Sequence, residues 1–446
     1  MLSLNADRME QVLGQYDGFQ TVGKLHSANG LLTAHMPVAI GALCELHLDK
    51  NRCRTAEVVG FDGDLAQILP FESIGGLSSR ATVTSSNRRF RVPVGPQLLG
   101  RVINGVGQPV DGMGPIRTST YIDLDINSPL AMHRERISEP FVTGQRVLDG
   151  CLTFGKGQRV GLFAGSGVGK STLLGEIAKG AQSDINVIAL IGERGREVRP
   201  FLDDCLGSEG LAKSIVVVST ADETPLMRIH AAQVAIALAS FHRDEGQDAL
   251  LLLDSMTRIA MAQREIGLLL GEPPSTRGYT PSVFTMLSKL LEQLGAAETG
   301  TITGIVTVLV DGDDMDEPIA DCVRGIVDGH IVLNRALAER AHFPAIDVVR
   351  SVSRVIMDIT SSEHLAAAQT LRQLLATYEE VAELVQIGAY RSGSNIEVDR
   401  AIALMPAVNA FLRQAPRETS TFADTVATLQ RIASAWKQQP REVTNA

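Results

Sequence analysis

Cysteine is scarce in this sequence, and the few cysteines follow no disulfide or ligand pattern. The 446 residues contain five cysteines, at positions 44, 53, 151, 205 and 322, and no two of them form a Cys-x-x-Cys pair. We therefore expect reduced thiols rather than disulfides or a zinc site. Metal ligation by Cys44 and Cys53 stays open as the alternative, although the nine histidines show no ligand spacing either.

Aromatic residues and positive charge are also in short supply. Aromatic residues make up 4% of the chain, and the formal net charge is -10. Proteins that bind nucleic acid usually present a basic surface and rings on which bases can stack. The basic stretch "SSNRRFR" could still line a pore, but the composition as a whole favours no nucleic-acid partner.

The sequence has no apolar run long enough to cross a bilayer. Its opening, "MLSLNADRMEQVLGQYD", carries charges where a signal peptide would be apolar. We expect a cytoplasmic protein, peripheral to a membrane at most. The hydrophobic share of 44% beside 21% charged residues is typical of a globular protein, and the length suits two or three domains.

The chain divides into four segments with different sequence patterns. Residues 1–17 suggest a short helix, and residues 18–92 alternate short apolar stretches with turn signals, which predicts a small β-barrel. Residues 93–361 alternate aliphatic runs with helix-like segments, which predicts an α/β domain with a parallel sheet. Residues 362–446 have helical spacing and form a C-terminal helical domain, whose first helix should stop at Gly388.

The segment "AGSGVGKST" lies between the apolar run "QRVGLFA" and a helix-like run. A glycine-rich turn between strand and helix exposes backbone N–H groups to phosphate, a lysine reaches the β and γ phosphates, and a hydroxyl can ligate Mg²⁺. The strict motif has glycine six residues before the lysine, where this chain has alanine. The predicted nucleotide-binding residues are Ala164, Gly165, Ser166, Gly167, Val168, Gly169, Lys170, Ser171 and Thr172.

Carboxylates follow two of the predicted strands. Asp254 ends "DALLLLD", where it could hold Mg²⁺ together with Ser171, although capping the next helix is an alternative role. Glu193 and Glu197 follow the strand "NVIALIG", and either could orient the attacking water. The spacing alone does not choose between these two acids.

Several ordered motifs together resemble the export ATPases of flagella and type III secretion systems, relatives of the catalytic subunit of rotary ATP synthases. They are "FAGSGVGKST", "IGERGREV", "LLLLDSMTR", "AMAQREIGLLLGEPPSTRGYTPSVF", "DGDDMDEPIAD" and "PAIDVVRSVSR", and the resemblance spans roughly residues 20 to 435. It implies a RecA-like P-loop nucleotide domain between an N-terminal β-barrel and a C-terminal helical domain.

The resemblance also implies roles for individual residues. Glu193 matches the catalytic glutamate of the family, and Arg194 would be a secondary contact of the γ phosphate. Arg354, the last residue of "SVSR", matches the arginine that family members insert into the active site of a neighbour. Phe343 stands where relatives commonly have a tyrosine that stacks on adenine, and it retains the aromatic face.

The function that the resemblance implies is Mg²⁺-dependent ATP hydrolysis by a ring, expected to be a hexamer, that supports type III protein export. The expected ligands are ATP, ADP and Mg²⁺. The expected partners are stalk and regulatory proteins of the export apparatus and chaperone-bound substrates, met at the cytoplasmic face of that apparatus. Gln263 and Tyr279 favour the flagellar branch over injectisome enzymes.

Two other functions fit the sequence less well. A non-catalytic nucleotide-binding ring subunit is disfavoured because such subunits usually lack a carboxylate at the position of Glu193. An RNA helicase of the transcription-termination type is disfavoured by the acidic net charge and the scarcity of aromatic residues.

Overall fold

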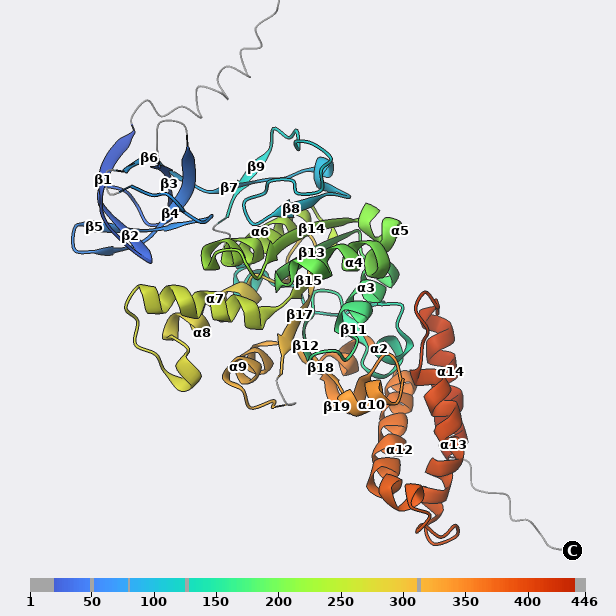
Figure 1. Ribbon diagram of the computed structural model, residues 1–446. Coiled ribbons are helices and arrows are strands. Elements are labelled where there is room, and N and C mark those ends of the chain that lie inside the picture. The colour runs from blue at the N-terminus through green and yellow to red at the C-terminus, as the bar shows by residue number, and fades with distance from the viewer. Residues whose placement is uncertain (1–19, 49–51, 79–80, 125–127, 311–313, 438–446) are drawn as a thin grey trace, which may run out of the picture.

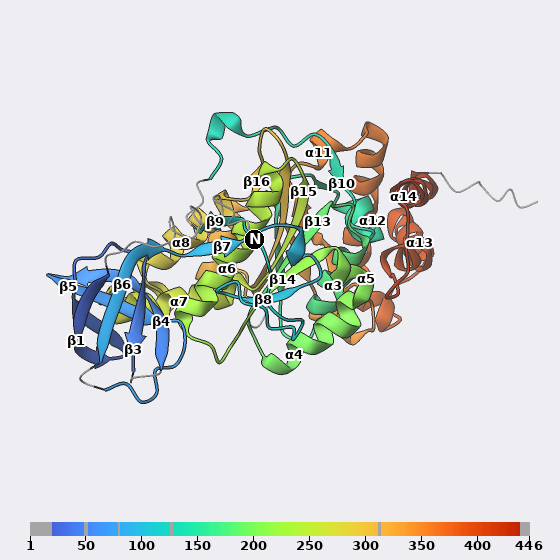
Figure 2. The same cartoon turned by 90° about the horizontal axis from the view of Figure 1, so that it is seen from above.

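The computed structural model describes residues 20–48, 52–78, 81–124, 128–310 and 314–437. A β-barrel lies at one end, a large sheet with helices on both faces forms the middle, and a group of helices lies at the other end (Figures 1 and 2). These three parts confirm the predicted fold class. The helix predicted for residues 1–17 lies outside the described residues.

The N-terminal barrel is a closed sheet of six antiparallel strands in the order β1-β2-β5-β4-β3-β6. Buried and solvent-facing residues alternate along its strands, so one side of each strand fills the barrel. Its core includes Leu32, Leu46, Val58, Ile68 and Val83. The strands are β1 (Thr21–Asn29), β2 (Leu31–His35), β3 (Ala42–His47), β4 (Cys53–Asp62), β5 (Leu65–Pro70) and β6 (Thr82–Arg89).

The central sheet has nine strands, and its main path runs β19-β18-β12-β17-β15-β13-β14-β8, with β16 paired to β17 outside that path. Most neighbours are parallel, as predicted, but β19 is antiparallel to β18 and β16 to β17. The chain returns from β18 to β19 through a short helical turn, which suits an antiparallel pair. The strands are β8 (Val102–Asn104), β12 (Arg159–Ala164), β13 (Ile185–Glu193), β14 (Ser214–Thr220), β15 (Asp248–Asp254), β16 (Gly295–Ala296), β17 (Thr301–Leu309), β18 (Gly329–Leu333) and β19 (Ile346–Ser353).

Both faces of this sheet are covered, which explains its almost wholly apolar strands. On β15, Leu250 and Leu252 join one apolar cluster, whereas Leu251 and Leu253 join another with residues of α6, α7, α8 and α9. Helices of the nucleotide domain are α2 (Arg146–Cys151), α3 (Lys170–Gly180), α4 (Gly195–Pro200), α5 (Gly207–Ala212), α6 (Pro225–Asp244), α7 (Met256–Leu269), α8 (Pro281–Glu292), α9 (Pro318–Ile326), α10 (Arg335–Glu339) and α11 (Ile356–Ile359).

The C-terminal part consists of α12 (Ser362–Gln386), α13 (Ile396–Leu412) and α14 (Phe422–Lys437). The side chains of Leu371, Phe411 and Leu429, one from each helix, belong to the same apolar cluster as Leu162 of β12. The helical part packs against the nucleotide domain through α2 and the edge strand β19. Gly388, with φ of 70°, follows the end of α12. Among the described residues, no helix is both long and apolar enough to span a membrane.

Two short antiparallel ribbons lie outside the barrel and the nine-stranded sheet, namely β7 (Arg91–Pro93) with β9 (Tyr121–Asp123), and β10 (Pro140–Phe141) with β11 (Phe154–Gly155). The edge strand β8, which lies between β7 and β9 in the sequence, is held by Asp111. The Asp111 carboxylate accepts hydrogen bonds from Arg101 Nε at 2.7 Å and Nη2 at 3.0 Å, and from the Val102 backbone N–H at 3.1 Å. Hydrogen bonding by Arg101 is the main reason why the pKa of Asp111 lies far below its usual range.

This contact makes a prediction about stability and pH. Asp111→Asn should lower the thermal unfolding midpoint by about 2–4 °C at neutral pH, because the charge-assisted bonds weaken. A lowered pKa stabilises the folded state above the pKa of an unfolded aspartate, about 3.9, and that stabilisation is lost as the pH falls further. The gap between variant and wild type should therefore shrink below about pH 4. Calorimetry across pH measures it.

Asp123→Asn is the matched control, because Asp123 pairs with Arg91 at the exposed surface. Exposed ion pairs contribute little to stability, so this variant should melt with the wild type. If the difference in thermal midpoint between Asp111→Asn and wild type stays constant from neutral to acid pH, the stabilising role assigned to the Asp111 carboxylate is contradicted.

Candidate functional site

The glycine-rich loop joins the end of β12 to the start of α3, at the carboxyl end of the parallel strands. Gly167 and Gly169 have φ of 78° and 91°, in the left-handed region that glycine adopts without strain. Val168 between them is 2% exposed and packs into the core, whereas Ser166 and Gly167 face solvent. The loop is thus anchored by one apolar side chain and open on its outer side.

Ala164 occupies the position where the strict motif has glycine, and the structure shows why alanine fits. It is the last residue of β12, it is fully buried, and its backbone oxygen accepts a hydrogen bond from Val310 N–H at 3.1 Å. Its φ is not positive. The methyl group therefore fills space in the core, and the turn itself begins after it, at Gly165.

Lys170, the first residue of α3, contacts two carboxylates. Its Nζ lies 2.5 Å from Asp254 Oδ1 and 3.4 Å from Glu193 Oε1. Asp254 ends β15 and Glu193 ends β13, so the carboxyl edge of the parallel sheet brings them to the loop. Thr307 of β17 also donates its hydroxyl to Asp254 Oδ1, at 2.6 Å.

The pKa shifts of this cluster follow from burial and charge. Burial acts to lower the pKa of Lys170, but the charges of Asp254 and Glu193 outweigh it, so the pKa is raised and the ammonium stays charged. Burial is also the main influence on Glu193 and raises its pKa, while Lys170 opposes the shift. The cluster thus holds a buried cation shared between two acids.

Glu197, the alternative to Glu193 in the sequence, does not contact Lys170. Its side chain is 47% exposed and pairs with Arg194 Nη1 at 3.4 Å, on the first turn of α4. Arg194 itself is 68% exposed. The two neighbouring acids therefore have different surroundings, and Glu193 alone of the two contacts Lys170.

The oxygen atoms near the loop suit a hard divalent cation. Ser171 and Thr172 are exposed on the first turn of α3. The carboxylate of Asp254 contacts Lys170, which belongs to the same turn. Hydroxyl and carboxylate oxygens are the ligands that Mg²⁺ prefers. The donor set of Ser171 and Asp254 therefore fits this ion.

A cavity of about 290 Å³ opens beside the loop, and Phe343 forms part of its wall. Phe343 is 43% exposed, and the edge of its ring lies 3.4 Å from where a Cβ on Gly169 would be. Of the residues in this wall, the sequence predicts Phe343 and the loop residues Gly167, Gly169 and Thr172. The other residues lie far apart along the chain and carry no local motif; they include Gln145, Pro344, Gln414, Ala415 and Pro416.

Arg354 lies at the amino ends of the parallel strands, whereas the loop of the same chain lies at their carboxyl ends. Ser353 pairs with Gly329 at the start of β18, which runs parallel to β12, and the Arg354 backbone N–H donates to Asp328 O at 3.0 Å. The six residues of β12 separate this edge from the loop by roughly 20 Å. Arg354 is exposed, and its guanidinium donates to Arg324 O.

Comparison with known proteins agrees with this arrangement. Residues 144–353 match the family model described as "ATP synthase alpha/beta family, nucleotide-binding domain", and residues 360–431 match "T3SS EscN ATPase C-terminal domain". The flagellum-specific ATP synthase of Bacillus subtilis is 48% identical over 93% of this chain and 95% of its own length. The type 3 secretion system ATPase of Xanthomonas euvesicatoria is 48% identical over 90% and 91%.

Solved structures agree as well. The assembled ATPase EscN of the enteropathogenic E. coli type III secretion system superposes with a TM-score of 0.87 at 43% identity, covering 92% of this chain and all of that one. EscN in complex with its central stalk EscO has a TM-score of 0.85 at the same identity and coverage.

The loop geometry predicts the effect of removing the lysine. Lys170→Ala should weaken binding of a nucleoside triphosphate about ten- to a hundred-fold, because one charge-assisted contact is lost and two carboxylates are left beside the phosphates. Titration with a fluorescent ATP analogue measures the affinity. Lys179→Ala is the control, since Lys179 lies on the same helix and pairs with Glu176. Equal affinity for the Lys170 variant and wild type would contradict the site.

Proposed function

The chain belongs to the flagellum-specific and type III secretion ATPases of the ATP synthase alpha/beta family, and from this premise we propose that it hydrolyses ATP in a ring of identical subunits and supports type III protein export. The observation that carries the proposal is the contact of Lys170 with both Asp254 and Glu193 beside an open glycine-rich loop.

This contact sets the order of events when ATP binds. The backbone N–H groups of the loop face the phosphates, and Lys170 exchanges its carboxylate partners for phosphate oxygens. The exchange leaves Glu193 without its cation at the moment when the γ phosphate arrives. Glu193 is then free to accept a hydrogen bond from a water molecule and to orient it toward phosphorus.

Ser171 and Asp254 would hold Mg²⁺, which neutralises charge on the β and γ phosphate oxygens when it is bound. Thr307 fixes one oxygen of Asp254 by its hydrogen bond of 2.6 Å. Phe343 offers an aromatic face to adenine in the cavity beside the loop, and Arg194, exposed beside Glu193, can turn toward the γ phosphate.

The position of Arg354 makes the site depend on a second subunit. Its own loop lies at the other edge of the sheet, so its guanidinium serves the loop of a neighbour. An arginine supplied in trans accelerates phosphoryl transfer about 10³- to 10⁵-fold in well-studied systems. One chain carries both halves of the interface, which suits a closed homomeric ring, and we assign six subunits to it.

Relatives from flagella and from injectisomes match this chain equally well. We assign the chain to flagellar export, on Gln263 and Tyr279; the injectisome role is the alternative. Because the similar ATPase EscN has been solved with a central stalk protein, a stalk partner in the centre of the ring is part of the proposal. Chaperone-bound export substrates complete it, at the cytoplasmic face of the export apparatus.

The two neighbouring acids provide a test of the chemistry. Glu193→Gln should lower kcat about 10²- to 10⁴-fold with little change in ATP affinity, because the amide cannot accept a proton from water. Glu197→Gln should stay within a few-fold of wild type. Steady-state hydrolysis and equilibrium binding measure the two effects separately. Similar losses in both variants would point to a general charge effect and would remove the assigned role of Glu193.

Mixing two inactive variants tests the trans arginine. Arg354→Ala retains an intact loop, and Lys170→Ala retains an intact arginine. Each should be nearly inactive alone, yet an equal mixture should regain up to about a quarter of the wild-type sites if neighbours combine at random. The recovery is measured as phosphate release after the variants are mixed and allowed to assemble.

Arg350→Ala is the matched control, since Arg350 is an exposed arginine on β19, the strand that precedes Arg354, and this variant should remain active alone. A mixture as inactive as its two components, in rings shown to contain both chains, would contradict action in trans. Full activity of Arg354→Ala by itself would do the same.

A further inference from the structure

A cluster of three potential metal ligands lies on the N-terminal barrel, far from the phosphate loop. Ligand atoms of Glu45, His47 and Cys53 all lie within 4.8 Å of one another. Sequence spacing indicated no such site, because Cys53 and His47 come from different strands. We propose that these three side chains form a binding site for Zn²⁺. The inference is independent of the proposed ATPase activity.

Strand pairing brings the three ligands together. His47, the last residue of β3, is the direct partner of Cys53, the first residue of β4, and Glu45 precedes His47 by two residues on the same strand. Alternate residues of a strand share one face. Cys44 precedes Glu45, Leu46 lies between Glu45 and His47, and both are buried in the barrel. The three ligands therefore lie on its outer face.

The contacts within the cluster suit metal binding. Cys53 Sγ lies 3.1 Å from His47 Nδ1, while His47 Nε2 lies 2.9 Å from Thr84 Oγ1. Histidine ligands of metals are usually oriented in this way, by a hydrogen bond at the ring nitrogen that does not bind the ion. Zinc bonds of about 2.3 Å to sulfur and about 2.0–2.1 Å to nitrogen at a tetrahedral angle need the two atoms about 3.5–3.6 Å apart. An opening of about half an ångström is therefore enough.

The ligand types select the ion. A thiolate, an imidazole and a carboxylate form a mixed set that suits Zn²⁺, whereas Mg²⁺ and Ca²⁺ prefer oxygen alone. Thiolate and carboxylate also balance the two positive charges. Three protein ligands leave a fourth position for water, as in zinc sites that are open to solvent.

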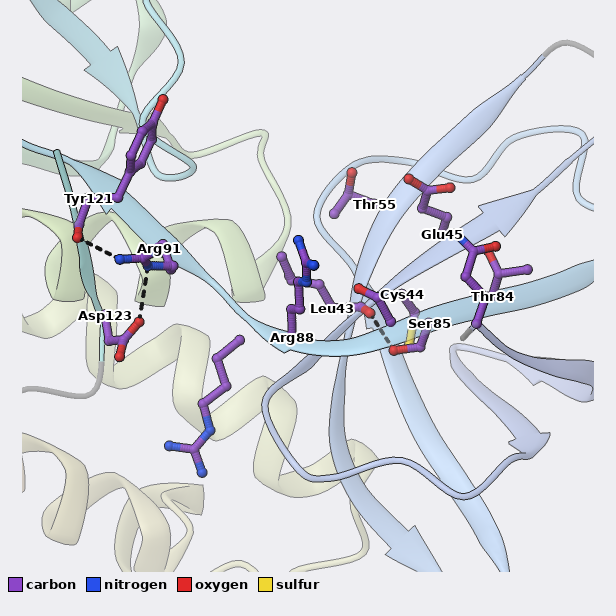
Figure 3. Close-up of a pocket in the computed structure, with 13 residues that line it drawn as sticks. Leu43, Cys44, Glu45, Thr55, Thr84, Ser85, Arg88, Arg91, Tyr121 and Asp123 are labelled. Carbon is purple, nitrogen blue, oxygen red and sulfur yellow. Dashed lines mark hydrogen bonds and ion pairs between the residues drawn. The ribbon is translucent and has the colours of Figure 1, made fainter. Parts of the chain in front are cut away.

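The surroundings keep this site accessible. Glu45 and Thr84 line a cavity of about 880 Å³ between the barrel and the β7–β9 ribbon, and Figure 3 shows both side chains on neighbouring barrel strands. Glu45 and Cys53 are exposed. A bound ion would join the ends of β3 and β4 at the rim of the barrel and so stabilise their pairing.

The test uses the full chain, reduced and freed of metal by a chelator, with Zn²⁺ and then Co²⁺ added alone. Wild type should bind one Zn²⁺ that raises the thermal midpoint, and Co²⁺ should give a thiolate-to-metal charge-transfer band. Cys53→Ser should lose the band and bind Zn²⁺ at least about ten-fold more weakly, and Thr84→Val should weaken binding about 10- to 100-fold by freeing the imidazole.

Two controls keep the result specific. Cys322→Ser and His26→Ala remove a cysteine and a histidine outside the cluster and should leave binding and the Co²⁺ band unchanged. Unchanged ATP hydrolysis by Cys53→Ser shows that the variant is folded. Zn²⁺ affinity equal to wild type in Cys53→Ser, or the absence of a thiolate band in wild type, would overturn the site and reduce the contact of Cys53 with His47 to a hydrogen bond.

Discussion

The burial of one ammonium group beside two carboxylates is the constraint on which the nucleotide site depends. Burial disfavours the charged form of Lys170, and the charges of Asp254 and Glu193 outweigh that effect, so the pKa of Lys170 is raised. The two acids in turn tolerate each other because the cation lies between them. The ammonium group therefore offsets one of the two negative charges without a ligand, and a bound polyphosphate competes for a cation that is already engaged.

The second constraint is the distance between the glycine-rich loop and Arg354, which the sheet sets. The loop, Glu193 and Asp254 gather at the carboxyl ends of parallel strands, where ligand sites of such sheets usually form. Arg354 follows an antiparallel edge strand and so emerges at the amino ends. No side-chain rotation can cover roughly 20 Å. If Arg354 completes the site as proposed, it must therefore come from a second subunit.

Local patterns predicted the parts of the site that adjoin one another in the sequence. The loop between β12 and α3 could be read directly, as could Asp254 at the end of an apolar strand. Spacing could not separate Glu193 from Glu197, because the difference between them is the distance to Lys170. Thr307 and the metal ligands of the barrel depend on strand pairing. Strand pairing brings together residues that are distant in the sequence, so no short motif identifies them.

The cavity beside the loop shows the same limit on a larger scale and explains why the helical domain matters to the site. Gln414 follows α13, yet its backbone N–H donates to Phe343 O at 3.0 Å and its amide nitrogen donates to Gly144 O at 2.9 Å. Its amide oxygen accepts from Arg146 N–H at 2.8 Å. One buried residue, through its backbone and its side chain, thus ties the C-terminal helices to both walls of the cavity. Because Ala415 and Pro416 come from the same turn, a displacement of α13 would break these bonds or carry the cavity wall with it, so the helical domain is a structural component of this cavity.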